Sequence, residues 1–318
     1  MRGKILAGLL GVSFLFNIAG LVFFICFLNV QSNYKKVRRE RNQMAHNLSV
    51  IRGASVISDA TDSDHISKRP FVSHLDGQED IFGFLPPVNN PGALDNTLIV
   101  YLHGMGSNYL EPFVYPSEQS IADGITARHK KICFLSPNYR KDSSWGNDEA
   151  ISDITQNIRE VMQQYPFKQI VLMGTSMGGC TALNYATSAP PDIKEKIKGI
   201  VSVEGAGDLN KLYQISRHPS IKPAMIVAFK GTPDQLPAVY RRKSFLNNID
   251  KLPAGTKVAV ISAKFDKIVP PELQKDIVRG LEEKHFPVKL VELDGGHGAP
   301  PALVYLDGFN WVMEPTAN

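Results

Sequence analysis

The chain has 318 residues, of which 43% are hydrophobic and 21% charged, a balance typical of a folded protein with a sizeable core. Its formal net charge is only +4, so the composition gives no broad basic face for nucleic acid. The three cysteines, Cys26, Cys133 and Cys180, form no C-x-x-C pair and lie at no metal-ligand spacing, so they indicate neither a disulfide framework nor a zinc site.

The first predicted element is a helix that spans a membrane. Residues 5–30 include no charged side chain, and a helix of this length reaches about 39 Å, enough to cross a bilayer with some tilt. A cleaved signal peptide is the alternative. The apolar run is longer than a signal core of about 7–15 residues, and no A-x-A cleavage site follows it, so the sequence favours the anchor.

The charges on either side of this span favour a cytoplasmic position for the rest of the chain. Arg2 and Lys4 precede the span, whereas five basic residues follow it between positions 35 and 41, and the more basic side usually stays in the cytoplasm. Within the span, Ala7 and Gly11 form a small-xxx-small pair that is compatible with a dimer, although such pairs are frequent in membrane spans.

After the span the chain changes character twice. Residues 31–66 are polar and poor in aromatic side chains, which predicts a juxtamembrane tether. Residues 67–318 are predicted to form the folded domain. It opens with two short apolar runs around Asp76-Gly77, a pattern that indicates an antiparallel hairpin.

The rest of the domain alternates strand-like and helix-like segments. The expected strands are continuous apolar runs rich in β-branched residues, as in strands buried on both faces of a parallel sheet. They lie at residues 97–103, 131–137, 169–175, 199–205, 257–263 and 288–294. Segments 147–165 and 271–285 carry apolar residues at helical spacing. The alternation predicts an α/β domain with helices on both faces of a mostly parallel sheet, and chemistry belongs at the carboxyl ends of its strands.

A serine between glycines stands at one of these strand ends. In "GTSMGG", Ser176 follows the expected strand 169–175 and precedes a helix-like segment, the setting of a G-x-S-x-G nucleophile elbow. Gly174 and Gly178 remove side chains that would collide with the neighbouring strand and helix in so sharp a turn. A glycine-rich turn with a capping serine is the alternative, because five-residue matches are common by chance.

Two later strand ends supply partners for a serine nucleophile. A serine hydroxyl needs a histidine to take its proton and a carboxylate to orient that histidine. His297 follows the last expected strand, and Asp266 follows the strand before it, which gives the chain order Ser, Asp, His. Glu204 also ends a strand and is the alternative acid.

An oxyanion produced at this serine would need two backbone N–H donors. One is expected from Met177, the residue after the nucleophile, and the other from Met105, which lies between Gly104 and Gly106 in "YLHGMGSN". His103 in the same loop has no second metal ligand nearby, and the sequence has no phosphate-binding P-loop. We therefore expect no metal and no cofactor.

The segments "HGMGSN", "GTSMGG", "AKFDKIVP" and "GGHG" occur in an order that resembles the α/β-hydrolase superfamily, over about residues 70 to 315. The resemblance implies the α/β-hydrolase fold and a serine hydrolase acting on small acyl esters. The stretch 136–154 is also similar to the N-Y-R-G-S stretch of the prolyl oligopeptidase-like group, with Lys141 where that group has glycine. A small-peptide or aminoacyl hydrolase is thus one alternative, and a catalytically silent membrane-anchored binding domain is another.

In this superfamily an insertion such as residues 206–255 often forms a small cap over the site. It contains four aromatic residues that either line an acyl pocket or pack the cap onto the domain: Tyr213, Phe229, Tyr240 and Phe245. The basic run 240–244, "YRRKS", either receives an anionic substrate or lipid headgroup or forms a solvated helix face.

Overall fold

A computed structural model of the chain describes residues 66–87, 96–116, 119–140 and 143–315. Within these ranges, no helix is both long and apolar enough to cross a bilayer. The predicted span at residues 5–30 and the tether at residues 31–66 lie outside them, apart from the last residue of the tether.

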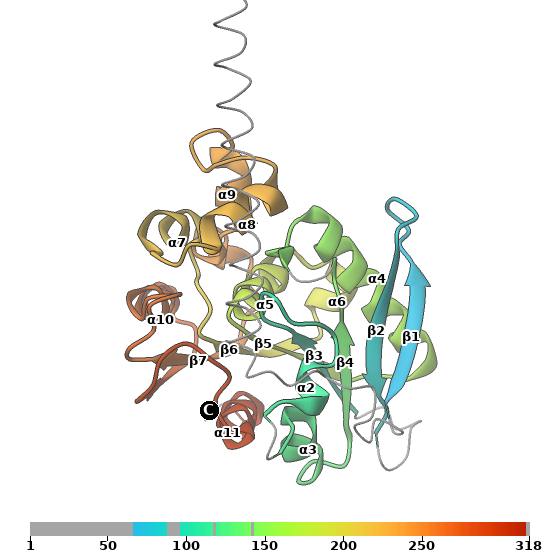
Figure 1. The fold of residues 1–318 in the computed structure, drawn as a ribbon. Helices are drawn as coiled ribbons and strands as arrows, with labels where there is room; N and C mark the ends of the chain where they lie inside the picture. The colour runs from blue at the N-terminus through green and yellow to red at the C-terminus, as the bar shows by residue number, and fades with distance from the viewer. Residues whose placement is uncertain (1–65, 88–95, 117–118, 141–142, 316–318) are drawn as a thin grey trace, which may run out of the picture. The chain divides into compact units, whose positions relative to one another are not determined.

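The described chain forms an eight-stranded sheet with the strand order β1-β2-β4-β3-β5-β6-β7-β8 (Figure 1). The strands are β1 (Ser67–Val72), β2 (Glu79–Leu85), β3 (Thr97–Leu102), β4 (Ile132–Pro137), β5 (Gln169–Thr175), β6 (Ile197–Val203), β7 (Lys257–Ala263) and β8 (Val288–Leu293). Strands β1 and β2 pair antiparallel, β2 pairs antiparallel with β4, and all other pairs are parallel. The predicted hairpin and the six predicted strands are therefore present.

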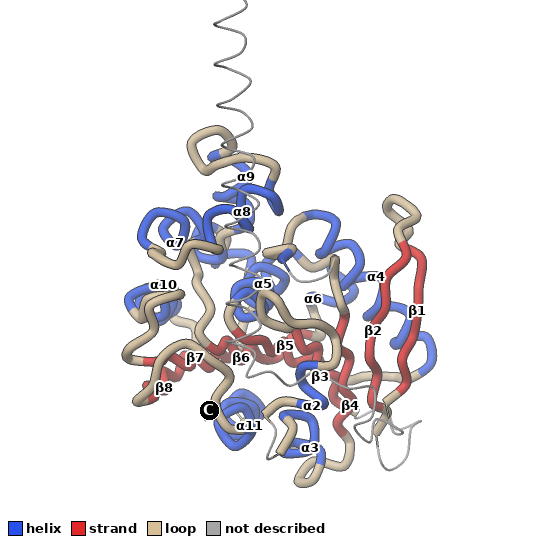
Figure 2. The backbone as a smooth tube through the Cα atoms, in the orientation of Figure 1, coloured by secondary structure: helices blue, strands red, loops and turns tan. Residues whose placement is uncertain are grey.

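Helices cover both faces of this sheet (Figure 2). They are α2 (Glu111–Val114), α3 (Ile121–Thr126), α4 (Asp148–Gln164), α5 (Met177–Ser188), α6 (Pro191–Lys194), α7 (Leu209–Ile215), α8 (Ile221–Phe229), α9 (Pro237–Lys243), α10 (Glu272–Glu283) and α11 (Ala302–Met313), with 3₁₀ turns η2 (Phe245–Asn247) and η3 (Ile249–Lys251). Helices α4, α5 and α10 pack on one face, and α3 and α11 on the other. Each face has its own apolar core.

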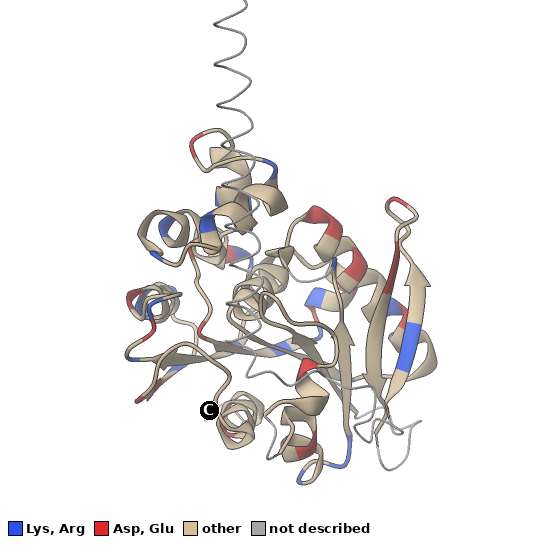
Figure 3. Ribbon diagram, viewed as in Figure 1, with Lys and Arg blue, Asp and Glu red and all other residues tan. Residues whose placement is uncertain are grey.

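The sequence explains why the sheet lies in the middle. Strands β3, β4 and β5 carry no charged residue, and nearly every residue in them is buried (Figure 3). Helix α4 has one apolar face, and Asn147 caps its first turn by accepting the N–H of Ala150. Strand β8 lies at the edge of the sheet and has four half-buried and two exposed residues, so it departs from the expectation of strands buried on both faces.

The segment between β6 and β7 forms three short helices and two 3₁₀ turns, α7, α8, α9, η2 and η3, here called the cap. Three of its four aromatic side chains, Phe229, Tyr240 and Phe245, are at most 5% exposed and belong to the core. Packing of the cap onto the domain is therefore their role in this structure. Two of the three cations in the basic run on α9, Arg242 and Lys243, form ion pairs with Asp148 on α4.

In the stretch 136–154, which resembles the prolyl oligopeptidase-like group, Arg140 joins the β1–β2 hairpin to helix α4, an arrangement here called the clamp. Arg140, with φ 73°, contacts the β1–β2 hairpin through Ser73 and Asp76 and contacts helix α4 through Asp153. Its backbone N–H donates to Asp80 at 3.0 Å. Lys141 lies outside the described residues.

Candidate active site

Ser176 occupies a sharp turn between β5 and α5. Its backbone has φ 56° and ψ −117°, a strained conformation for a residue with a side chain. A Cβ atom at Gly178 would collide with the carbonyl oxygen of Leu102, and one at Gly174 would lie 2.5 Å from the backbone of Gly178. The glycines are therefore required by the close approach of three backbone segments.

The three residues predicted from separate strand ends lie together in one hydrogen-bonded chain. His297 Nε2 is 2.9 Å from Ser176 Oγ, and His297 Nδ1 is 2.7 Å from Asp266 Oδ2. The serine hydroxyl donates to Nε2, so the ring proton is on Nδ1 and is donated to Asp266. This is the geometry by which a histidine takes a proton from a serine nucleophile.

Asp266 is fixed by the loop that carries it. Its second oxygen, Oδ1, accepts the backbone N–H groups of Ile268 and Val269 at 2.8 and 2.9 Å. These bonds orient the carboxylate toward His297. The side chain is buried, so water does not compete for the contact.

Glu204, the alternative acid, reaches the same histidine. Its Oε2 is 3.2 Å from His297 Nδ1 and accepts the N–H of Gly298 at 2.8 Å. Burial raises the pKa of Glu204 to about 7, while the charge of His297 and the bond from Gly298 act in the opposite direction. The pKa of His297 is raised, because the hydrogen bond and charge of Asp266 and the charge of Glu204 outweigh the lowering effect of burial.

Glu204, Asp266 and His297 also have ligand atoms close enough to one another to hold a metal ion. Hydrogen bonds already account for this arrangement. The 2.7 Å contact between Asp266 and His297 has the length of a charge-assisted hydrogen bond. Asp266 Oδ1 and Glu204 Oε2 accept backbone N–H groups. The two described cysteines are not competing nucleophiles, since burial raises the pKa of both Cys133 and Cys180 to about 12.

The loop after β3 approaches the serine. A Cβ atom at Gly104 would lie 4.0 Å from the Cβ of Ser176. The N–H of Gly104 is already used, because it donates to Glu111 Oε2 at 3.0 Å. The N–H groups of Met105 and Met177 donate no hydrogen bond within the described residues. The assignment of these two N–H groups as oxyanion donors stays a prediction.

A buried polar network joins this loop to the serine turn. Tyr101 donates its hydroxyl to Glu111 Oε1 at 2.7 Å and lies 3.0 Å from the hydroxyl of Thr175, which lies 2.7 Å from the hydroxyl of Tyr305. Sequence analysis missed Glu111 and this network, and no spacing pattern in the chain points to it. His103, whose ring nitrogens both lie near backbone carbonyl oxygens, also supports the loop.

This arrangement identifies the fold of the described chain. The strand order, the serine turn after β5 and the acid and histidine after β7 and β8 are those of the α/β-hydrolase fold. A family model described as alpha/beta hydrolase fold matches residues 97–253.

Comparison with solved structures finds the same fold. Similar structures include a puromycin-hydrolyzing peptidase of Mycobacterium tuberculosis, with 17% identity over 76% of this chain and 37% of that one and a TM-score of 0.58. An acylaminoacyl peptidase of Pyrococcus horikoshii shows 16% identity over 77% and 42%, with a TM-score of 0.60. An S-formylglutathione hydrolase from Staphylococcus aureus shows 17% identity over 78% and 98%, with a TM-score of 0.59.

This chain spans less than half the length of the two peptidases. A search of curated proteins found no match. Since all these identities are low, the similarity establishes the fold, and the chemistry has to be argued from the site.

Proposed function

We propose that this protein is a serine hydrolase that cleaves small carboxylic esters through an acyl-enzyme intermediate. Ser176 is the nucleophile, His297 the general base and acid, and Asp266 the carboxylate that orients His297. The observation that carries the proposal is the continuous chain of hydrogen bonds from Ser176 Oγ through both ring nitrogens of His297 to Asp266.

The contacts among Ser176, His297 and Asp266 support the proton transfers of an acyl transfer. His297 Nε2 accepts the hydroxyl proton as Ser176 Oγ attacks the ester carbonyl carbon, and the oxygen of that carbonyl becomes an oxyanion bound by the N–H groups of Met105 and Met177. The protonated His297 then donates to the departing alcohol, which leaves an acyl group on Ser176. Water, deprotonated by the same nitrogen, attacks the acyl-enzyme and releases the carboxylic acid.

The test is hydrolysis of short and medium p-nitrophenyl esters by the full chain. Ser176→Ala and His297→Ala should each lower kcat by about 10⁴-fold or more, because the members of such a unit depend on one another. Ser188→Ala is the matched control, since Ser188 is an exposed serine on the same helix, α5. Equal activity in the parent and the Ser176→Ala variant would overturn the assignment.

Cleavage of short peptides or aminoacyl amides is the second candidate, favoured by the two peptidase structures among those similar to this chain. A panel of aminoacyl amides beside the esters separates the two substrate classes. A catalytically silent binding domain would fail both assays, and a serine-directed fluorophosphonate would not label Ser176.

We also propose that residues 5–30 anchor the protein in a membrane, with the hydrolase domain on the cytoplasmic side. The uncharged run supports the anchor, and the excess of basic residues between positions 35 and 41 supports the orientation. Protease added outside intact cells should leave the domain uncut. Trimming of the domain by the protease would show that the domain lies outside the cell. Release of the protein from membranes by alkaline carbonate would contradict the anchor at residues 5–30.

A further inference from the structure

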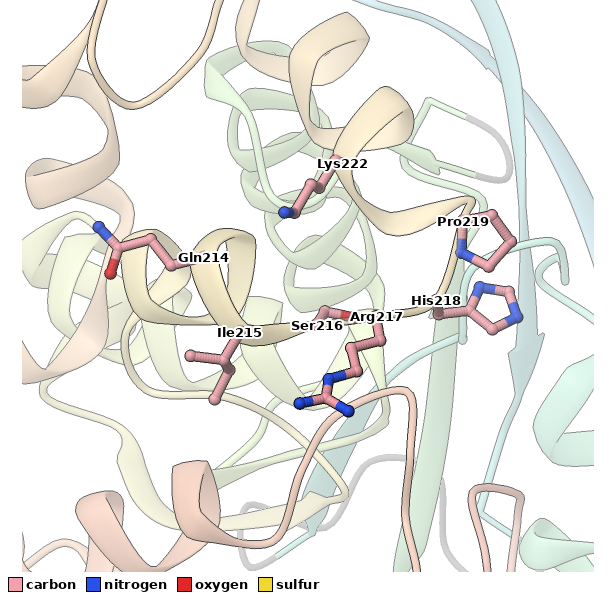
Figure 4. Close-up of a pocket in the computed structure, with 7 residues that line it drawn as sticks. All are labelled: Gln214, Ile215, Ser216, Arg217, His218, Pro219 and Lys222. Carbon is pink, nitrogen blue, oxygen red and sulfur yellow. The ribbon is translucent and has the colours of Figure 1, made fainter.

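The cap carries a pocket whose lining is basic. Residues 214–219 and Lys222 line an open pocket of about 480 Å³, and the lining includes Arg217, His218 and Lys222 but no acidic residue (Figure 4). These side chains come from the end of α7, the loop that follows it and the first turn of α8. The mechanism proposed above uses none of them.

Two contacts connect the pocket with the candidate active site. Ser216, in the pocket lining, donates its hydroxyl to the carbonyl oxygen of Ile268 at 2.8 Å, and the N–H of Ile268 donates to Asp266. The pKa of His218 is lowered, mainly by burial and in addition by the positive charge of His297. The path of two hydrogen bonds through Ile268 places the pocket lining next to the loop that carries Asp266, and the effect of His297 on His218 agrees with this placement.

Within the described residues, no acidic side chain pairs with the positive charge in the pocket. Arg217 and Lys222 form no ion pair in the part of the chain that the structure describes. Four basic residues elsewhere in the cap are paired, Lys211 with Asp276, Lys230 with Glu149, and Arg242 and Lys243 with Asp148, whereas Arg241 and Lys251 form no ion pair within the described residues. Lys222 also lies in the first turn of α8, where the helix dipole makes a cation unfavourable. Its ammonium, 5.5 Å from the ring centroid of Tyr213, is held in this position by the aromatic face.

His218 adds a hydrogen-bond donor to the two charges. The N–H of Ser220 donates to His218 Nδ1, and the hydroxyl of Ser220 lies 2.6 Å from the same nitrogen. A neutral ring that accepts at Nδ1 carries its proton on Nε2. Nε2 makes no hydrogen bond within the described residues, so this N–H is available to a ligand.

We propose that the pocket binds an anionic group of the substrate, a carboxylate or a phosphate, with Arg217 and Lys222 as charge partners and His218 as a hydrogen-bond donor. The guanidinium fork matches the two oxygens of either group, and the ammonium supplies a second positive charge. The inference rests on the proposed function and names its substrate class: esters that carry a negative charge away from the scissile bond.

The test compares matched anionic and neutral esters with the full chain. The pairs are 4-acetoxybenzoate against methyl 4-acetoxybenzoate, for charge on the leaving group, and mono-4-nitrophenyl suberate against its methyl ester, for charge on the acyl chain. A third anionic substrate, 4-acetoxyphenyl phosphate, distinguishes phosphate from carboxylate. The measured quantity is kcat/KM for the anionic ester divided by kcat/KM for the neutral one.

Arg217→Gln and Lys222→Met should each lower this ratio about tenfold through KM, as expected for the loss of one charged hydrogen bond. Added salt should lower it in the parent. Arg241→Gln is the control, because Arg241 is an exposed arginine of α9 outside the pocket lining, and its ratio should equal that of the parent. The same ratio in the parent and both pocket variants would overturn the proposal.

If the proposed function is wrong, the parent hydrolyses neither the anionic nor the neutral ester, an outcome distinct from failure of the pocket proposal. In that case the pocket is tested by calorimetric titration of 4-hydroxybenzoate and of its neutral methyl ester into the full chain. Binding of the anion alone, weakened about tenfold in Arg217→Gln, supports the pocket. Equal binding of both compounds, or binding of neither, overturns it.

Discussion

Glu204 Oε2 lies 3.2 Å from His297 Nδ1, the nitrogen that also lies 2.7 Å from Asp266 Oδ2. Two buried carboxylates from neighbouring strand ends thus face one side of the ring, while Ser176 faces the other. Glu204 has φ 51°, and the N–H of Gly298 holds its side chain in place. We expect this second carboxylate to affect both the pH dependence of the reaction and the tolerance of the site to loss of Asp266.

Replacement of Glu204 by glutamine should move the acid limb of the pH profile to lower pH. His297 must be neutral to act as a base, so kcat/KM rises with pH as the ring loses its proton. The negative charges of Asp266 and Glu204 raise the pKa of His297 above its usual 6.5, which puts the midpoint of the parent's limb above that value. Because burial raises the pKa of Glu204 to about 7, its carboxylate is only partly ionised across this limb, so Glu204→Gln removes a partial charge and the expected shift is small. The amide keeps an oxygen that can accept from Gly298.

The measurement is kcat/KM for a neutral p-nitrophenyl ester across the acid limb in the parent and the Glu204→Gln variant. Glu283→Gln, at an exposed position on α10, is the control and should have the parent's profile. A limb that stays in place, or moves to higher pH, in Glu204→Gln would show that the charge of Glu204 does not act on His297.

Asp266→Asn should lower kcat less than the same substitution does in a serine hydrolase whose histidine faces only one carboxylate. Loss of the acid from a serine, histidine and aspartate unit costs about 10⁴-fold in kcat, because the ring loses its orientation and the stabilisation of its charge. Here Glu204 can accept the Nδ1 proton in place of Asp266, so we expect a loss of about 10²-fold in the single variant and about 10⁴-fold in Asp266→Asn/Glu204→Gln. Equal kcat values in the single and double variants would exclude a supporting role for Glu204.

Glu111→Gln should lower kcat with little change in KM. Glu111 accepts two hydrogen bonds, one from Tyr101 and one from the N–H of Gly104, next to the proposed oxyanion donor Met105. An amide has one oxygen, so one buried donor loses its acceptor and the loop shifts. A small displacement of the Met105 N–H from the oxyanion should lower kcat by about 10-fold to 10²-fold.

Steady-state kinetics with a neutral ester tests this role of Glu111. Glu149→Gln is the control, because Glu149 lies in the first turn of α4 and pairs with exposed Lys230. A rise in KM at constant kcat in Glu111→Gln would assign the network to substrate binding and contradict transition-state positioning.

Much of the sheet and the meeting of Ser176, Asp266 and His297 could be predicted from local patterns. Uninterrupted apolar runs such as β5 fit only a strand covered on both faces, and chemistry in a parallel sheet lies where its strands end. The required glycines around Ser176 also follow from local geometry, because a turn with φ 56° leaves no space for side chains at positions 174 and 178.

The supporting contacts could not be predicted in this way. Thr175 and Tyr305 are 130 residues apart in sequence, and Tyr101 meets Thr175 across 74 residues. The first pair depends on how α11 packs against the sheet and the second on the pairing of β3 with β5, and no residue near either partner specifies these arrangements. The basic run on α9 was a candidate for anion binding, but two of its three cations, Arg242 and Lys243, pair with Asp148 from a distant helix, whereas Arg217 and Lys222 in the pocket form no ion pair within the described residues.

Arg140→Met should destabilise the domain by about 3–5 kcal/mol, as expected when one partner of a buried ion pair is removed. The side chain of Arg140 is 8% exposed and that of Asp153 is fully buried. Burial already raises the pKa of Asp153, with the bonds from Ser73 and Arg140 acting in the opposite direction. Methionine fills a similar volume but leaves this carboxylate without a counter-charge and frees the hairpin at Asp76.

Arg159→Met is the matched control for this prediction. Arg159 makes a similar fork to Asp192, but both side chains are 50% exposed, so its loss should cost about 0–1 kcal/mol. Urea unfolding of the parent and both variants, with the free energy of unfolding taken from the midpoints at a common slope, measures the difference. Equal losses in the two variants would mean that the clamp at Arg140 contributes no more than a surface ion pair, and the similarity of this stretch to the prolyl oligopeptidase-like group would then need a reason other than stability.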